Sequence, residues 1–152
     1  MAEYGREIES PRFFWVAILT VVLSVAAVLC VRAIAVRILH PSPAFQPLGL
    51  GPPIVDTVLC TVVAIFVFVT ISSYPNSIRL WRGVATAVLV VSLIPDVLLA
   101  VSHGMHGGWP EACALMIMHL VVYLICITML PALAFTTPVS TEDREKDPLS
   151  IL

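Results

Sequence analysis

The chain alternates between four long runs of apolar residues and short segments rich in proline, glycine or polar side chains. The apolar runs cover about residues 13–39, 54–72, 83–101 and 112–132. An α-helix of about 20 apolar residues spans the hydrocarbon core of a bilayer, and each run is close to that length. The pattern therefore predicts four transmembrane helices.

Many positions in these runs are β-branched, which in water would favour strands. Inside a bilayer, however, every backbone polar group must be satisfied within the protein, which leaves α-helices or closed β-barrels. Barrel strands alternate polar and apolar side chains, and the runs show no such period. We therefore expect an all-α polytopic membrane protein whose four helices run up and down in turn.

The connecting segments support this division of the chain. HPSPAFQPLGLGPP contains five prolines and two glycines, and proline interrupts a continuous helix, so we expect an extended loop there. SSYPNSIRLWR and SHGMHGGWPE predict short turns, and Pro110 suits the first turn of the following helix. Residues 1–12 and a polar tail at 136–152 then flank a transmembrane domain at 13–135.

Composition and charge narrow the class of protein. Only 12% of the residues are charged, whereas soluble domains carry about 25%, so the chain cannot cover a water-exposed surface. The net charge of -2 and the lack of a basic cluster give no indication of nucleic-acid binding. The first apolar run is too long for a signal peptide and lacks an A-x-A exit, so it is expected to be retained.

The distribution of basic residues predicts the orientation. An even number of spans places both termini on one side of the membrane. That side would carry Arg6, Arg12, Arg79, Arg82, Arg144 and Lys146, and the other side Arg32 and Arg37. Basic residues prefer the cytoplasmic side, so both termini of this multi-pass protein of the cell membrane are expected in the cytoplasm. Trp15 and Trp81 would lie at the inner interface and Trp109 at the outer one.

The ionisable residues within or beside the spans gather in the outer half of the predicted bundle. They are Arg32, Asp56, Asp96, His103, His106, Glu111 and His119. From the helical rise, Asp96 lies about 21 Å from the inner boundary and His119 about 12 Å from the outer entrance of the last span. A charge at mid-bilayer costs about 2.5 to 3.5 kcal/mol on insertion scales, so these side chains are expected to face the bundle interior.

Three roles for this group remain open. In a structural role, Arg32 pairs with Asp96 or Asp56, and His119 donates a hydrogen bond to a nearby carbonyl or hydroxyl. In a transport role, Asp96 and His119 relay protons beside a carbonyl that Pro95 leaves free. The inner half of the bundle offers no matching polar residues for a continuous path.

The third role is a metal site that opens outward. Asp96 and His103 are seven residues apart and share a helical face. His106 follows three residues later, and Glu111 and His119 arrive from the last span. Imidazole and carboxylate suit zinc or a similar divalent ion, and the methionines in this region would favour Cu(I).

Enzymatic chemistry has no comparable signal. The cysteines Cys30, Cys60, Cys113 and Cys126 lie singly in apolar runs, with no C-x-x-C pair. Such thiols behave as small apolar groups, so free cysteines are expected rather than thiol exchange. The spacing does not allow a nucleophile, a base and an orienting residue to be assigned.

Three short motifs carry a resemblance to a known family. They are Arg79-Leu80-Trp81-Arg82, Ser92-Leu93 with Pro95, and Met118-His119-Leu120. Together they resemble a bacterial family of small four-span membrane proteins catalogued only as a domain of unknown function, with the best agreement over the second to fourth spans. Asp96 and residues 103–108 depart from the family pattern, whereas His119 is the position that would carry over. The resemblance implies the architecture and no activity.

We therefore expect a small integral membrane protein without enzymatic activity or cofactor. It would be a structural or accessory subunit that packs against lipid and against other membrane proteins or itself. The alternative is an outward-facing metal-binding or transport module that uses Asp96, His103, His106 and His119.

Overall fold

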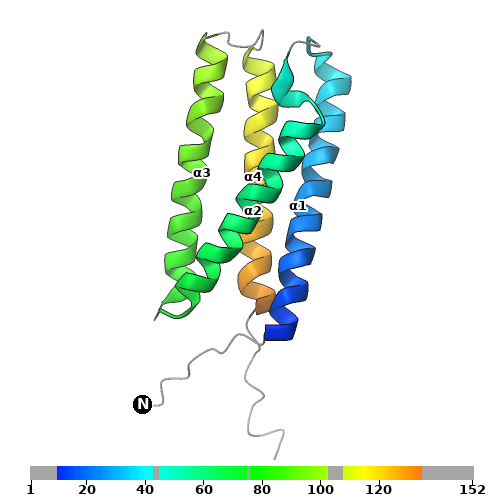
Figure 1. Cartoon of the computed structure of the whole chain (residues 1–152). Helices are drawn as coiled ribbons and strands as arrows, with labels where there is room; N and C mark the ends of the chain where they lie inside the picture. Colours follow the sequence, from blue (N-terminus) through cyan, green and yellow to red (C-terminus); the bar gives the residue numbers. More distant parts are fainter. Residues whose placement is uncertain (1–9, 43–44, 75, 103–107, 135–152) are drawn as a thin grey trace, which may run out of the picture.

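The described residues of the chain are helical apart from short connections (Figure 1). The computed structural model describes residues 10–42, 45–74, 76–102 and 108–134. The elements are α1 (Ser10–Leu39), the 3-10 helix η1 (Gln46–Leu48), α2 (Gly51–Ser72), α3 (Ser77–Ser102) and α4 (Trp109–Ala134). Four of these helices are long and apolar enough to cross a membrane, over Phe13–Leu39, Gly51–Ser72, Ser77–Ser102 and Trp109–Ala132. The prediction of an all-α protein with four spans is confirmed.

Three helices stand side by side and the fourth crosses them. Figure 1 shows α3, α4 and α1 in one layer, with α2 running obliquely across its face. Helix α1 packs along α4 and α2, and α3 packs along α4, whereas α2 and α3 contact each other little. We call the end of the bundle where α1 begins and α4 ends the terminal end. The opposite end, where η1 lies, is the loop end.

All four long helices begin earlier than the predicted spans, and the early starts of α2 and α3 change the picture most. Helix α2 begins at Gly51, so Pro52 and Pro53 lie in its first turn, where the N–H groups have no helical partner and proline costs little. The predicted extended loop is therefore shorter, and its middle forms η1. Helix α3 begins at Ser77, so Trp81 lies on a helix and not in the preceding turn.

The core at the terminal end is aromatic. Trp81 is only 2% exposed, and its ring lies edge-on to Phe68 of α2 at a centroid distance of 5.3 Å. Trp81 therefore faces the core and not the surroundings of the bundle, because α2 approaches α3 closely at this end and covers the indole. Trp15 and Trp109 are exposed on the outside of the bundle.

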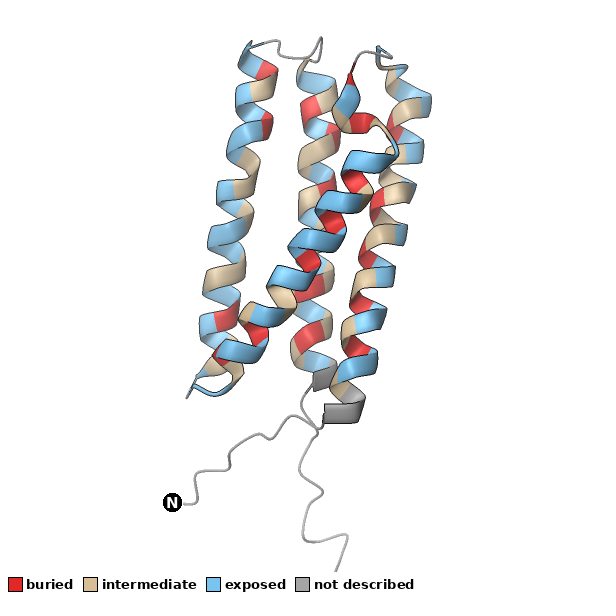
Figure 2. Ribbon diagram, in the orientation of Figure 1, coloured by how far each residue is buried: buried red, intermediate tan, exposed pale blue. Residues whose placement is uncertain are grey.

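A stripe of small side chains along α1 provides the close packing in the middle of the bundle. Val16, Thr20, Ser24 and Val28 are spaced four residues apart, and all are buried. Small residues let membrane helices approach closely. The buried Thr20 hydroxyl donates a hydrogen bond to the Val16 carbonyl at 2.7 Å. Apart from such stripes, most residues on the outward helix faces are exposed (Figure 2), as expected for surfaces in contact with lipid.

Candidate functional site

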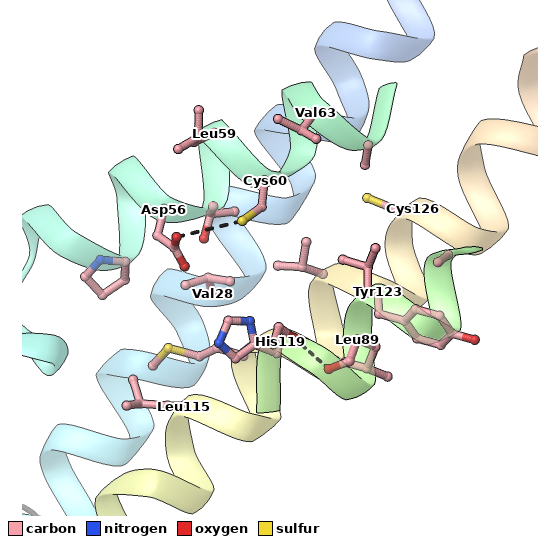
Figure 3. Close-up of a pocket in the computed structure, with 18 of the residues that line it drawn as sticks. Val28, Asp56, Leu59, Cys60, Val63, Leu89, Leu115, His119, Tyr123 and Cys126 are labelled. Carbon is pink, nitrogen blue, oxygen red and sulfur yellow. Dashed lines mark hydrogen bonds between the residues drawn. The ribbon is translucent and has the colours of Figure 1, made fainter. Parts of the chain in front are cut away.

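A cavity of about 490 Å³ lies between α2, α3 and α4, with Val28 of α1 and Pro47 of η1 also on its wall (Figure 3). Pockets for small molecules commonly have this size. On α3 the lining extends from Trp81 to Asp96, which corresponds to about 22 Å along the helix axis. The cavity is therefore elongated and runs parallel to the helices.

The cavity opens sideways, on the flank of the bundle. Leu59 and Val63 of α2 and Val88 of α3 line it, and these side chains are 61%, 51% and 62% exposed. The oblique course of α2 separates it from α3 here, so neither helix covers the other. In a membrane this opening faces the acyl chains.

One end of the cavity is polar because α3 and α4 bring two ionisable side chains together. The Nε2 atom of His119 lies 3.4 Å from the Oδ2 atom of Asp96. The two groups are not aligned as a hydrogen bond, and Asp96 Oδ2 has no hydrogen-bond partner among the described residues. Asp96 is only 6% exposed. A buried carboxylate oxygen on the cavity wall is thus left without a donor, which costs about 1 to 3 kcal/mol.

A second carboxylate reaches the cavity from α2. Asp56 is exposed, and its Oδ1 atom accepts a hydrogen bond from the Cys60 thiol at 3.7 Å. Figure 3 shows Asp56 and His119 pointing into the same space from α2 and α4. The structure therefore assembles Asp56, Asp96 and His119 on one cavity, at the part of the bundle nearer the loop end.

Further polar side chains on the cavity wall, among them Ser92, Tyr123 and Cys60, were not proposed as site residues from the sequence. The Ser92 hydroxyl donates to the Leu89 carbonyl at 2.7 Å. The Tyr123 and Thr86 hydroxyls lie 3.0 Å apart and join α4 to α3, and Cys60 bonds Asp56 as described. A signal was available, because Ser92 and Tyr123 each lie four residues from a proposed site residue and so share its helical face.

Arg32 does not pair with either carboxylate, so the expected ion pair is wrong. Its Nε–H donates to the backbone carbonyls of Leu48 at 2.8 Å and of Gly49 at 3.2 Å. The physical reason is that η1 folds back against α1 and presents carbonyls that have no helical partner. Arg32 thereby holds η1, whose Pro47 forms part of the cavity wall.

The proposed metal ligands are only partly described. His103 and His106 lie outside the described residues. The side chains of Asp96 and His119 lie next to each other. Glu111 instead accepts a hydrogen bond from the Gly108 N–H at 2.9 Å and caps the start of α4. Within the described ranges, no three His, Cys, Asp or Glu side chains come close enough to hold a metal ion.

The described cysteines are free thiols, as predicted. The cavity thus combines a long apolar wall with a hydrogen-bond acceptor that is buried and unpaired, an arrangement suited to binding. No protein-family model, curated protein or solved structure matches this chain. The resemblance to a four-span family of unknown function accordingly stays a prediction.

Proposed function

We propose that this small integral membrane protein is a non-enzymatic binding module that takes up an elongated amphipathic molecule from the bilayer. We call this elongated cavity the cleft. The apolar part of the molecule lies along the cleft toward Trp81, and its polar end lies at Asp96 and His119. The observation that carries the proposal is the unpartnered carboxylate oxygen of a buried Asp96 at one end of an apolar cavity.

The polar end of the cavity is expected to contribute most of the binding free energy and so to select the ligand. Lipid tails are about as apolar as the leucine and valine side chains of the cleft, so moving a chain from lipid into it yields little hydrophobic gain. A hydrogen bond from the ligand to Asp96 contributes more to binding, because a hydrogen bond is stronger in a site of low dielectric constant than in water. The cleft therefore supplies the shape and Asp96 supplies the affinity.

Two potential nucleophiles of the cleft, Cys60 and Ser92, have hydrogen-bond partners other than His119. Cys60 donates to Asp56 and Ser92 donates to a backbone carbonyl, and no hydrogen bond joins either group to His119 in the described structure. A nucleophile activated by a neighbouring base is the usual requirement for covalent catalysis. Binding without chemistry is consistent with this arrangement.

We propose that the protein lies in the cell membrane with both termini in the cytoplasm. The excess of Lys and Arg on the side of the termini supports this orientation. The cleft's polar end then lies in the outer leaflet, and its apolar length extends toward the inner one.

Tryptophan fluorescence tests the proposed binding directly. Two variants are made in which the other tryptophans are replaced by phenylalanine, so that each retains one. One variant retains the buried Trp81, which is 2% exposed, and the other retains the lipid-exposed Trp15, which is 69% exposed. In lipid nanodiscs, ω-bromohexadecanol, whose bromine quenches indole on contact, is expected to quench Trp81 more strongly than Trp15. The reason is that an alkyl chain bound in the cleft contacts the Trp81 indole, which the surrounding lipid does not reach.

A matched variant controls for changes in the bilayer. Ala85→Leu adds bulk to the cleft wall and is expected to reduce the quenching of Trp81 while leaving that of Trp15 unchanged. Stronger quenching of Trp15 than of Trp81 by the alcohol would show that the cleft takes up no chain, and the proposed function would then be wrong.

An accessory subunit is the second candidate. The sideways opening between Leu59, Val63 and Val88 favours it, because a transmembrane helix of another subunit, or of a second copy, would fit against the same apolar rim. Gentle extraction from the native membrane is then expected to recover the protein in a larger assembly. A single monodisperse species in several mild detergents would contradict this role.

A further inference from the structure

We infer that the ligand of the cleft is a long-chain primary amine whose ammonium group binds at Asp96 and Asp56. The inference rests on the proposed function and adds the chemical class of the head group. It follows from the charges around the polar end of the cavity, from the balance of donors and acceptors there, and from the direction of the cleft.

The polar end of the cavity is acidic. The ionisable residues on the whole described lining are Asp56 and Cys60 on α2, Asp96 on α3, and His119, Tyr123 and Cys126 on α4. Of these, Cys126 packs in the aromatic core at the terminal end and not at the polar end. Neither lysine nor arginine occurs in the described lining, and Arg32 is engaged with the carbonyls of Leu48 and Gly49. Two carboxyl groups, of Asp56 and Asp96, face the single imidazole of His119, so acidic groups outnumber basic ones at this end. An anionic head group would be repelled there, and a cation is attracted.

The hydrogen-bonding groups match an ammonium. Ionised carboxylates only accept hydrogen bonds, and a primary ammonium has three donors and no acceptor. Asp96 Oδ2 has no donor within the described structure, and Asp56 receives only the long bond from Cys60. A primary ammonium therefore satisfies the orphaned oxygen without leaving a polar atom of its own unpaired.

A quaternary ammonium fits less well. Such cations have no N–H and are held by cages of aromatic rings. The aromatic residues on the described lining are Trp81, at the far end of the cavity, and Tyr123, whose hydroxyl is engaged with Thr86. In Figure 3 the Tyr123 ring points away from Asp56 and His119. The polar end thus provides carboxylates and no aromatic cage.

The cleft also accounts for the chain of the amine. From Asp96 the lining continues past Leu89 and Ala85 to Trp81, about 22 Å along α3. The chain enters through the sideways opening while the head group reaches Asp96 past Asp56. A single unbranched chain follows this path.

A series of three head groups tests the inference with the two single-tryptophan proteins. The ligands are ω-bromohexadecylamine, ω-bromohexadecanol and ω-bromohexadecanoate, and the quenching of Trp15 corrects for the different amounts of each that enter the bilayer. The amine is expected to quench Trp81 at a concentration about tenfold lower than the alcohol, because a charge-assisted hydrogen bond replaces a neutral one. The carboxylate is expected to be the weakest.

The Asp96→Asn variant removes the charge and nearly preserves the shape. It is expected to abolish the advantage of the amine and to leave quenching by the alcohol in place. Its helical circular dichroism shows whether it folds. Asp56→Asn, at an exposed position, provides a second variant and is expected to reduce the advantage by a smaller factor.

The outcomes separate the two proposals. Equal quenching of Trp81 by amine and alcohol, or an advantage that survives Asp96→Asn, overturns the amine and leaves the binding cleft intact. Strongest quenching by the carboxylate also overturns it. If none of the three ligands reaches Trp81 more readily than Trp15, the binding function itself is wrong.

Discussion

The imidazole of His119 on α4 faces the carboxylate of Asp96 on α3, with Nε2 3.4 Å from Oδ2, yet the geometry forms no hydrogen bond. A pair that served only to hold the two helices together would be expected to align and to satisfy the buried oxygen. Here the oxygen is left without a donor on the wall of a cavity. The geometry of the pair therefore favours a role in binding over a purely structural role.

Replacement of Asp96 by leucine is expected to stabilise the protein. The substitution removes a buried acceptor that has no donor and fills its place with a side chain of similar size, which is worth about 1 to 3 kcal/mol. Thermal unfolding in detergent micelles, followed by helical circular dichroism, measures the change. A lower unfolding temperature for Asp96→Leu than for the wild type would show that the carboxylate holds α3 and α4 together.

Arg32 is expected to stabilise the loop end of the bundle. Arg32→Met keeps the aliphatic stem and loses the hydrogen bonds to the Leu48 and Gly49 carbonyls, which is expected to lower the free energy of unfolding by about 1.5 to 3 kcal/mol. Arg37→Met, at an exposed position on the same helix, is the matched control. Chemical unfolding of the two variants in micelles checks this, and equal losses would contradict the role of Arg32.

Metal content distinguishes the metal site from the amine site. Asp96 and His119 supply two ligands, whereas zinc sites in proteins use three or four. We expect purified protein and the His103→Ala/His106→Ala double variant to contain equal and negligible zinc and copper. Metal in the wild-type protein that is lost in the double variant would instead support a site completed by the histidines of residues 103–106.

The orientation is testable with two single-cysteine proteins. Leu50 near η1 and Tyr74 in the turn between α2 and α3 are 61% and 59% exposed, and they lie at opposite ends of the bundle. On a cysteine-free background, Leu50→Cys is expected to react with a membrane-impermeant maleimide in intact cells. Tyr74→Cys is expected to react only after permeabilisation, and the reverse result would place the termini outside.

The sequence by itself determined the four helices and the free thiols. The reason is local: a run of apolar residues long enough for the bilayer must satisfy its backbone internally, and a helix does so within each run. The sequence did not determine where α2 begins, because Pro52 and Pro53 are compatible with a loop and also with the first turn of a helix. The candidate residues Asp56, Asp96 and His119 were also visible as ionisable groups in apolar surroundings.

Only the tertiary structure decided how these groups are used. The partner of Arg32 depends on η1 folding back against α1, and the burial of Trp81 depends on α2 approaching α3 at the terminal end. The cleft exists because α2 then crosses the other helices obliquely and leaves α3 uncovered toward the loop end. Such crossings arise from packing between residues far apart in the chain, and in a membrane nearly uniform apolar faces leave little sequence signal for them.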